Sequence, residues 1–296
     1  MKISILGSNG FLSNSIAKYF NNLNWILDVY GLDPPLEYLC NRFIKCNLME
    51  ADIDCTCLLD SDIIIYAVGA GIQSNLKESN NLIYGLNVVA PITICNKLKE
   101  LSYKGIFVSF GSVFEMGETE EAHFFTEKEI LTSNSPAPSD YIVSKRIFSR
   151  FASSYKHEYT HWHFIIPTIY GKSENPNRLI PYTINSIRNN IPLHFTAGDQ
   201  TRQYIYVDEV PRLILLSYEK GLHSGVYNIQ GKETMTVKEI VELIHSVLGK
   251  EMPLDCFGTV SRSDVGMKYL ALDGSLLYNL VGFSAETSIS DSIMQY

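Results

Sequence analysis

The sequence predicts an α/β protein built on a parallel β-sheet with helices on both faces. The first observation is that short apolar runs alternate with longer segments of helical periodicity through the first half of the chain. Such alternation is typical of strand–helix–strand units, whose helices cover both faces of a parallel sheet. The candidate strands are residues 3–6, 26–32, 43–46, 63–67, 105–110 and 163–166. The candidate helices are residues 12–23, 81–101 and 139–155.

The second observation is a change of pattern at about Pro167, after which prolines punctuate shorter elements. The clearest helix there is residues 236–248, which has an apolar stripe on one side and Thr236 as a candidate N-cap. We therefore predict two parts. Residues 1–166 form the main sheet with its helices, and residues 167–296 form a smaller lobe with some segments returning to the sheet.

Composition argues against several classes of protein. The chain has 296 residues and is 46% hydrophobic, so it is long enough for a large core. Its formal net charge of −8 argues against nucleic acid or an acidic membrane as a partner. No apolar stretch reaches the roughly 18 residues of a membrane span. The first residues lead directly into a strand, so no signal peptide is expected.

Cysteine and histidine usage gives two further expectations. The chain has six cysteines and no paired CxxC pattern, which predicts reduced thiols in the cytoplasm. His161 and His163 precede a candidate strand and lie on one face, but no third ligand accompanies them. We therefore predict no metal site.

A glycine-containing turn, Gly7-Ser-Asn-Gly10, follows the first candidate strand. Gly7 permits a tight turn, and Gly10 lets backbone N–H groups approach a diphosphate at a helix N-terminus, where the helix dipole favours anions. The second candidate strand ends near Asp33, whose carboxylate can accept hydrogen bonds from an adenosine ribose and repels a 2′-phosphate. These features predict a dinucleotide site that prefers NAD to NADP. The alternative is a tight turn with an N-capping serine.

Tyr141 and Lys145 lie four residues apart in a candidate helix, so their side chains share one face. A nearby ammonium favours the phenolate, so we expect the pKa of Tyr141 to lie below its reference value of about 10. Such a tyrosine can exchange a proton with a substrate hydroxyl near neutral pH. The alternative is an ordinary solvated helix face. The preceding residues 115–139 are polar and are expected to form a surface loop near the site.

These residues resemble the extended short-chain dehydrogenase/reductase family, and within it the nucleotide-sugar epimerases, dehydratases and ketoreductases. The resemblance covers nearly the whole chain and rests on these motifs: Gly7-x-x-Gly10, Tyr66-Ala67-Val68-Gly69, Ser109-Phe-Gly-Ser112-Val-Phe114, Tyr141/Lys145, Pro167-Thr-Ile-Tyr170-Gly171, Asn177-Arg178-Leu179-Ile180-Pro181 and Arg202-Gln-Tyr-Ile-Tyr206-Val-Asp208. It implies a Rossmann-type doubly wound parallel sheet with a smaller C-terminal α/β substrate lobe. It also implies NAD as cofactor, with NADP possible, a nucleotide-diphosphate sugar as substrate, a cytoplasmic location and a homodimer.

The resemblance also implies which residues form the site. The catalytic residues are expected to be Tyr141, Lys145 and Ser112. Cofactor contacts are expected from Gly7, Asn9, Gly10, Phe11, Leu12, Asp33, Asn47, Leu48, Ala67, Val68, Gly69, Asn87, Ser109, Tyr141, Lys145 and Pro167. Substrate contacts are expected from Ser112, Asn177, Arg178, Leu179, Arg202, Tyr204 and Arg262. Arginines suit a diphosphate because guanidinium groups fork onto phosphate oxygens.

One departure from the family pattern concerns the helper hydroxyl, which by alignment falls on Phe110. Phenylalanine cannot hydrogen-bond a substrate oxygen, and Ser109 and Ser112 are the nearby alternatives. We favour Ser112, on the expectation that a bend at Gly111 turns it inward. Gly111 and Ser112 also occupy the positions of the acid pair of 4,6-dehydratases, so dehydration is not expected.

Three functions remain open at the level of sequence. The first is an NAD-dependent nucleotide-sugar epimerase that moves a hydride at a sugar carbon, C4. The alternative is a nucleotide-linked 4-keto-6-deoxyhexose reductase. The second alternative is a dinucleotide-binding module without catalysis, which Phe110 supports and the intact pair of Tyr141 and Lys145 opposes.

Overall fold

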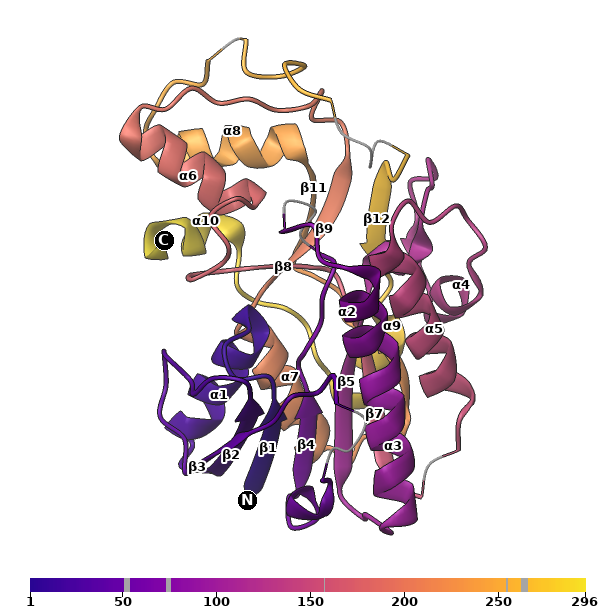
Figure 1. Cartoon of the computed structure of the whole chain (residues 1–296). Coiled ribbons are helices and arrows are strands. Elements are labelled where there is room, and N and C mark those ends of the chain that lie inside the picture. The colour runs from indigo at the N-terminus through magenta and orange to yellow at the C-terminus, as the bar shows by residue number, and fades with distance from the viewer. Residues whose placement is uncertain (51–53, 73–75, 157, 254, 262–265) are drawn as a thin grey trace.

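The computed structural model describes residues 1–296 except 51–53, 73–75, 157, 254 and 262–265. Its larger part is a seven-stranded sheet in which every neighbouring pair of strands is parallel (Figure 1). In sheet order the strands are β10 (Gly225–Asn228), β7 (Thr160–Ile166), β5 (Ile106–Ser112), β4 (Ile63–Tyr66), β1 (Lys2–Leu6), β2 (Ile26–Gly31) and β3 (Arg42–Lys45). The predicted doubly wound parallel sheet is confirmed.

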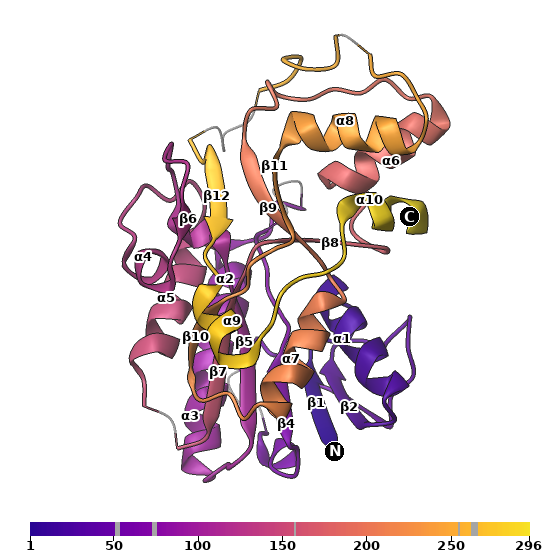
Figure 2. The same ribbon diagram turned by 180° about the vertical axis from the view of Figure 1, so that it is seen from behind.

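Helices cover both faces of this sheet, as Figures 1 and 2 show from opposite sides. One face carries α1 (Phe11–Asn22), α7 (Glu209–Glu219) and α9 (Ser275–Val281). The other carries α2 (Asn80–Tyr84), α3 (Ala90–Glu100) and α5 (Asp140–Ser154), with the π-helical turn η3 (Gly85–Val89) between α2 and α3. The strands are apolar on both faces because each face packs against helices.

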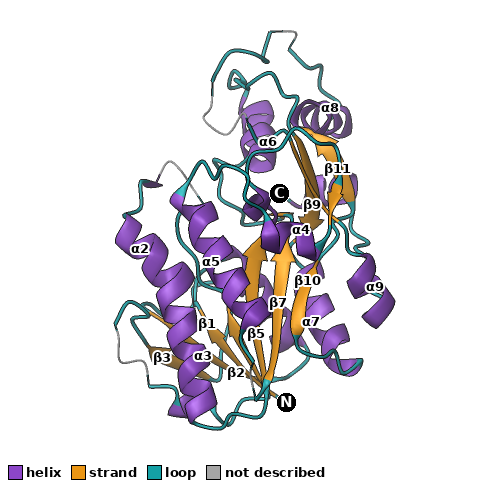
Figure 3. Ribbon diagram, turned by 90° about the vertical axis from the view of Figure 1, so that its right-hand side faces the viewer, coloured by secondary structure: helices purple, strands orange, loops and turns teal. Residues whose placement is uncertain are grey.

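A second, smaller sheet lies beyond the carboxyl ends of the large sheet (Figures 1 and 3). Its strands are β11 (Glu233–Thr236), β9 (Thr201–Tyr206), β12 (Tyr269–Leu272) and β6 (Phe124–Phe125) in that order, with β8 (Thr168–Tyr170) paired to β9. The helices of this lobe are α6 (Leu179–Asn189), α8 (Val237–Val247) and α10 (Ile289–Ser292), whereas α4 (Glu127–Thr132) packs against α5 and β10. The short 3-10 turns are η1 (Thr56–Leu58), η4 (Val113–Met116) and η5 (Ile293–Gln295). The apolar faces of α6, α8 and β9 form the core of the lobe.

The candidate strands and helices are confirmed, with ends shifted by a few residues. The histidine run lies inside β7 and not before it. The expectation of a surface loop over residues 115–139 is wrong, because this segment holds the second half of η4, the whole of β6 and the whole of α4. Two capping boxes order it, at Ser112 with Glu115 and at Thr126 with Glu129.

The carboxyl ends of the parallel strands point toward the smaller lobe, which is where ligands bind in open α/β sheets (Figure 1). The chain segments that leave these ends carry the sequence-predicted site residues, so the fold brings distant motifs to one edge. Among the described residues, no helix combines the length and the apolar character needed to span a bilayer.

Candidate active site

The turn from β1 into α1 has the geometry of an anion site. Gly7 adopts a φ of +112°, and a Cβ there would lie 2.9 Å from Cγ2 of Val68, so a larger residue does not fit. Gly10 is the N-cap of α1, and among the described residues no side chain hydrogen-bonds to cap this helix. The first-turn amides, which include those of Phe11 and Leu12, therefore remain available to an anionic ligand. A diphosphate fits this cradle.

Asp33 lies just beyond β2 with an exposed side chain, next to the first turn. Asn9 holds the loop that carries it, since its Nδ2 donates to the backbone oxygens of Asp33 (3.5 Å) and Pro34 (3.0 Å). The Oδ1 atom of Asn9 accepts from the backbone N–H of Leu36 at 3.0 Å. The loop that carries Asp33 is thus fixed beside the turn from β1 into α1 by the Asn9 amide.

Asn47 and Leu48 follow β3 at the same edge of the sheet. The Asn47 side chain bonds within its own loop, accepting from the N–H of Met49 and donating to Glu50, each at 3.1 Å. Leu48 is buried and belongs to the core on the α3 side of the sheet. In this structure the Asn47 side chain therefore stabilises its own loop, and the Leu48 side chain packs in the core.

Residues 67–70 follow β4 and are tied down by Asn87 from the π-helical turn η3. The Asn87 amide accepts from the Ala70 N–H (3.0 Å) and donates to the Ala70 carbonyl (2.9 Å). It also donates to the Ser144 hydroxyl at 2.9 Å, which connects the loop to α5. Ser144 was not predicted, although its place directly before Lys145 is a sequence signal that could have pointed to it.

Tyr141 and Lys145 lie one turn apart on α5, which Ser139 caps at its N-terminus. The Lys145 Nζ lies 5.9 Å from the centre of the Tyr141 ring and donates to the Phe110 carbonyl at 2.9 Å. A Cβ built on Gly69 would lie 3.9 Å from the same Nζ. The ammonium therefore lies between the end of β5 and the loop that follows β4.

The expected lowering of the Tyr141 pKa is wrong. Burial raises the pKa of Tyr141 to about 12, while a hydrogen bond from the Ser112 hydroxyl and the charge of Arg178 oppose this rise. Burial also lowers the pKa of Lys145 to about 8, against the charge of Glu115. Desolvation outweighs the one-turn charge interaction because both groups are buried.

Ser112 ends β5 and lies at the Tyr141 phenol. Its Oγ accepts from the Phe114 N–H at 3.3 Å as the N-cap of η4, and its hydroxyl opposes the rise of the Tyr141 pKa. The expected bend at Gly111 is wrong, since β5 stays paired with β7 through Ser112. Phe110 packs into the core on the α1 and α7 side of the sheet, so its ring fills apolar space there.

Ser109 points into the interior and not toward the dinucleotide edge. Its buried hydroxyl lies 2.8 Å from His161 Nε2 and 2.8 Å from His163 Nδ1. The other nitrogen of His163, Nε2, lies 2.8 Å from the Ser149 hydroxyl of α5. The two histidines therefore take part in a buried hydrogen-bond network. Among the described residues, no group of three or more His, Cys, Asp or Glu side chains is placed to hold a metal ion.

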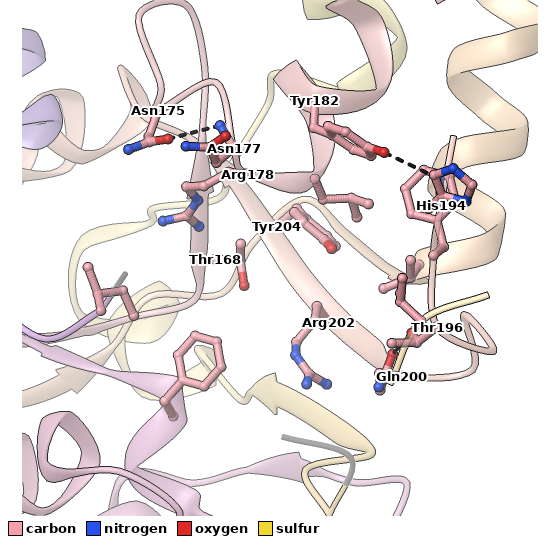
Figure 4. A pocket seen from close by; sticks show the side chains of 16 residues that line it. Thr168, Asn175, Asn177, Arg178, Tyr182, His194, Thr196, Gln200, Arg202 and Tyr204 are labelled. Atoms are coloured by element: carbon pink, nitrogen blue, oxygen red, sulfur yellow. Dashed lines mark hydrogen bonds between the residues drawn. The ribbon is translucent and has the colours of Figure 1, made fainter. Parts of the chain in front are cut away.

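A cavity of about 460 Å³ is bordered by loops that leave the large sheet and by residues of the smaller lobe (Figure 4). It is lined by Ile72, Phe114, Thr168, Asn175, Asn177, Arg178, Leu179, Tyr182, His194, Phe195, Thr196, Gln200, Arg202, Tyr204, Val237 and Val260. Figure 4 shows the guanidinium groups of Arg178 and Arg202 on either side of Thr168. The predicted substrate contacts Asn177, Leu179 and Tyr204 line the same cavity, whereas Arg262 lies outside the described residues.

The two cavity arginines are held differently. Nε of Arg178 lies 2.6 Å from Oε1 of Glu174, so this guanidinium is already paired with a carboxylate. Arg202 donates to the Thr201 carbonyl at 2.8 Å, and its Cζ lies 5.9 Å from the centre of the Phe114 ring. Both groups are pre-positioned by the protein, which suits recognition of an anion at a fixed place.

The cavity adjoins Tyr141 and, through it, Lys145. A Cβ built on Gly71 would lie 3.2 Å from Cβ of Tyr141, and the next residue, Ile72, lines the cavity. Pro167 separates β7 from β8, so the chain passes from the large sheet to Thr168 in the cavity wall. A ligand in the cavity therefore has Tyr141 near one end.

One wall of the cavity was missed by sequence reasoning. The backbone N–H of His194 donates to the Tyr182 hydroxyl at 3.3 Å, and the Thr196 hydroxyl donates to Gln200 Oε1 at 3.2 Å. Phe195 stacks on Phe257 with ring centres 5.3 Å apart. A signal was present, since these residues directly precede the recognised motif that begins at Arg202, but nothing local predicts which of them face a cavity.

A parallel sheet with a glycine turn at the first strand, together with a tyrosine and a lysine one turn apart beside it, defines a dinucleotide-dependent enzyme of the short-chain dehydrogenase/reductase class. A family model described as the NAD dependent epimerase/dehydratase family matches residues 3–229. The chain belongs to this family, and NAD is the family's cofactor.

Several curated relatives are named for work on nucleotide sugars. CDP-abequose synthase of Salmonella muenchen is 27% identical over 216 residues, which cover 71% of this chain and 68% of that protein. UDP-glucuronate 4-epimerase of Thermodesulfobacterium geofontis is 24% identical over 238 residues, covering 79% and 70%. The dTDP-D-glucose 4,6-dehydratase of Dictyostelium discoideum is 27% identical over 266 residues, covering 77% and 58%.

Solved structures share the fold. MoeE5 in complex with UDP-glucuronic acid and NAD superposes with a TM-score of 0.83 at 18% identity, covering 99% of this chain and 97% of that one. The UDP-glucose 4-epimerase of Thermotoga maritima also gives a TM-score of 0.83 at 18% identity, covering 99% and 96%. The expected Rossmann-type architecture with its second lobe is therefore the architecture of known nucleotide-sugar enzymes.

Proposed function

We propose that this protein transfers a hydride at a hydroxyl-bearing carbon, C4, of a sugar carried by a nucleoside diphosphate. One observation carries the proposal. The Tyr141 phenol lies at the Ser112 hydroxyl and one turn from Lys145, where the dinucleotide edge meets the arginine-lined cavity. Relatives named as 4-epimerases support C4 as the reacting carbon.

The residues at the sheet edge suit NAD. Gly7 and the first turn of α1 would hold the diphosphate, and Asp33 would accept the 2′-hydroxyl of the adenosine ribose. Lys145 would hold the nicotinamide ribose, since its ammonium already lies beside the loop after β4. When bound, NAD supplies the hydride acceptor and donor at the sugar carbon.

The cavity suits the nucleotide part of the substrate. Arg178 and Arg202 face it from two sides and present forked donors that match phosphate oxygens. The wall formed by Tyr182, Phe195 and Gln200 offers aromatic surface and polar groups for a nucleoside. The sugar would then extend toward Tyr141.

Proton transfer falls to Tyr141 with Ser112 as its partner. As the hydride leaves the carbon, the phenolate takes the proton of the sugar hydroxyl, and as the hydride returns the phenol gives a proton back. Ser112 would hydrogen-bond the same oxygen and replace the helper hydroxyl that Phe110 cannot provide. The charge of Lys145 favours the phenolate at the moment of proton removal.

The first candidate reaction is epimerisation. An epimerase reduces the same carbon that it oxidised, so it needs no net reductant and can keep its NAD bound. Named 4-epimerases among the relatives and structural neighbours support this reading. A carboxylate at Asp33 also disfavours NADPH, the usual biosynthetic reductant.

The second candidate is reduction of a 4-keto-6-deoxyhexose, and a separate observation favours it. Burial raises the pKa of Tyr141 to about 12, so the phenol carries its proton at neutral pH. That is the form needed to protonate the sugar oxygen as a hydride adds to a ketone. A reductase needs this step in one direction only.

One experiment separates these reactions. UDP-, dTDP- and CDP-linked hexoses are incubated with the purified protein without added cofactor, and products are followed by proton NMR. Interconversion of C4 stereoisomers supports the epimerase. Product formed only from a 4-keto-sugar with stoichiometric NADH supports the reductase. Bound NAD with no turnover in either arm overturns the proposal in favour of a binding module, and water loss would overturn our expectation against dehydration.

A further inference from the structure

Glu115 has a buried carboxyl whose charge acts on both Tyr141 and Lys145. It lies in η4, immediately after β5, and its side chain is fully buried. Oε1 accepts from the Ser112 N–H at 2.8 Å and so completes the capping box of this turn. Oε2 is buried and has no hydrogen-bond partner among the described residues. The cap therefore explains one carboxyl oxygen and leaves the other without a structural role.

The groups around this carboxyl converge on Gly111. A Cβ built there would lie 2.7 Å from Glu115 Oε1 and 2.8 Å from His163 Nε2, so the carboxyl and the imidazole meet over the missing side chain. The Ser149 hydroxyl lies 2.8 Å from Nε2 of the same imidazole. The Lys145 ammonium is anchored to the carbonyl of Phe110, the residue before Gly111. The glycine thus makes room for a polar cluster behind the active site.

The charges in this cluster depend on one another. Burial raises the pKa of Glu115 to about 7, against the Ser149 hydroxyl, the Ser112 N–H and the charges of Lys145 and Arg146. For Lys145, burial lowers the pKa to about 8, and Glu115 is the group that opposes this fall.

Three other groups complete the surroundings of Glu115. Burial lowers the pKa of His163 to about 3, so it is neutral and adds no competing positive charge. The charge of Glu115 also raises the pKa of Tyr141. It therefore disfavours the phenolate directly, while it favours the ammonium form of Lys145. Arg146 also acts on this residue, because its Nε donates to the backbone carbonyl of Glu115 at 2.6 Å and its charge opposes the raised pKa of the carboxyl. The carboxylate is thus balanced by two cations, Lys145 and Arg146, whereas Glu115 is the group that opposes the lowered pKa of Lys145.

We propose that Glu115 is a positioning residue that supplies the buried counter-charge of Lys145 and keeps it an ammonium. A neutral amine at Lys145 would neither favour the Tyr141 phenolate nor bind a ribose by a charged hydrogen bond. The catalytic meaning of this pair rests on the function proposed above. The charge coupling itself does not, since it is a property of the protein without substrate.

The test is a pH titration of Lys145 in protein carrying 13Cε-labelled lysine, with Lys145→Ala assigning the resonance. Glu115→Gln keeps the shape and can retain the Ser112 N–H bond but removes the charge. We expect it to lower the Lys145 pKa by about one unit, a tenfold change in the ammonium-to-amine ratio. The control is Glu127→Gln, another partly buried glutamate with a raised pKa, which bonds to the Asn228 N–H and should leave Lys145 unchanged.

A reciprocal measurement guards against misfolding of Glu115→Gln. In 13C-glutamate protein, Lys145→Met should raise the pKa of Glu115, because coupling between two titrating groups acts on both. An unchanged Lys145 pKa in folded Glu115→Gln, or an unchanged Glu115 pKa in Lys145→Met, overturns the inference.

Two further readouts separate this role from a merely structural one. NADH affinity should fall with rising pH at a lower pH in Glu115→Gln than in the wild-type protein, while the low-pH affinity stays within a few-fold. If the pKa values of Glu115 and Lys145 prove coupled but the protein turns over no nucleotide sugar, the inference about Glu115 holds and the proposed function is wrong. Loss of turnover in Glu115→Gln without any shift of the Lys145 pKa would do the opposite.

Discussion

The Tyr141 phenol is buried, and its pKa depends on burial and on the neighbours Ser112, Glu115 and Arg178. Burial raises its pKa to about 12, and the Ser112 hydroxyl and the charge of Arg178 act in the other direction. At neutral pH the phenol is therefore protonated and ready to donate. To act as a base it must lose that proton, and each neighbour that stabilises the phenolate then contributes directly to the rate.

Replacing Tyr141 with phenylalanine removes this proton carrier with little change of shape. We expect turnover of the true nucleotide sugar to fall by about 10²–10⁴-fold, while the dissociation constant for NADH stays within a few-fold. Steady-state rates and calorimetry measure the two quantities. Tyr278→Phe, at an exposed position on α9, serves as the matched control. Activity of Tyr141→Phe within a few-fold of the control would contradict the assignment.

The two serines of β5 should respond differently to alanine. Ser112→Ala should slow single-turnover rates because it removes the hydroxyl near Tyr141, and it should also lower the free energy of unfolding by about 1 kcal/mol because it removes the N-cap of η4. Ser109→Ala should instead lower the free energy of unfolding by about 1–3 kcal/mol, because it leaves His161 and His163 with unpaired buried atoms. Urea unfolding and single-turnover kinetics check both. The reverse pattern would move the helper role to Ser109.

For single residues, the sequence predicts correctly those features that depend only on the spacing of residues along the chain. Tyr141 and Lys145 were found because a helix places residues four apart on one face. The pKa of Tyr141 was predicted in the wrong direction, because burial depends on strands and loops far away in the chain. Ser112 was favoured for a bend at Gly111 that does not exist, since pairing with β7 keeps β5 regular.

Among the elements, the turn from β1 to α1 makes the sharpest demand on its sequence. Gly7 has a positive φ and also touches the loop after β4, with 2.9 Å between a built Cβ and Val68. Gly221 also has a positive φ, of +63°, but a Cβ there meets nothing within 4 Å. The two glycines therefore separate backbone strain from loss of the ligand cradle.

Gly7→Ala should weaken NADH binding at least tenfold, whereas Gly221→Ala should leave it unchanged. Both changes place alanine in the left-handed region, which costs roughly 1–2 kcal/mol of stability. Only Gly7→Ala also pushes the loop of residues 67–70 away from the diphosphate cradle. NADH titration followed by fluorescence, together with thermal unfolding, tests the pair. Equal NADH affinity in both variants would show that the turn does not hold the dinucleotide.

Element prediction worked best for long periodic segments and worst for irregular ones. The helix expected over residues 81–101 exists, but a π-helical turn interrupts it and places Asn87 against residues 67–70. No local pattern encodes that turn, because it is stabilised by the loop contact. Residues 115–139 looked like an exposed loop because they are polar, yet two capping boxes and a few apolar anchors order them.

At the scale of the whole molecule, the smaller lobe has features that local sequence patterns do not predict. Its sheet pairs β6 with β12 and β8 with β9, so segments far apart in the chain meet. The boundary predicted at residues 166 and 167 remains a prediction. Which residues line the cavity depends on how these segments assemble, and His194, Thr196 and Gln200 were missed for that reason.

The outer surface of α2, α3 and α5 leads to the last prediction, which concerns assembly. These helices lie side by side on one face of the large sheet (Figures 1 and 3). Val89, the last residue of η3 before α3, is 59% exposed, and Ile147 of α5 is 42% exposed. The resemblance to the family implies a homodimer, and apolar residues on neighbouring helices suit such an interface. Light scattering should then give twice the chain mass of 33.4 kDa.

Charged substitutions should locate that interface. The double variant Val89→Asp with Ile147→Asp should shift the protein to monomers, because unpaired carboxylates are costly in an apolar contact. Leu280→Asp is the control, since Leu280 is 49% exposed on α9, which covers the opposite face of the sheet. Sedimentation velocity at several protein concentrations measures both variants. A wild-type monomer, or a dimer that only Leu280→Asp disrupts, would place the contact elsewhere or remove it.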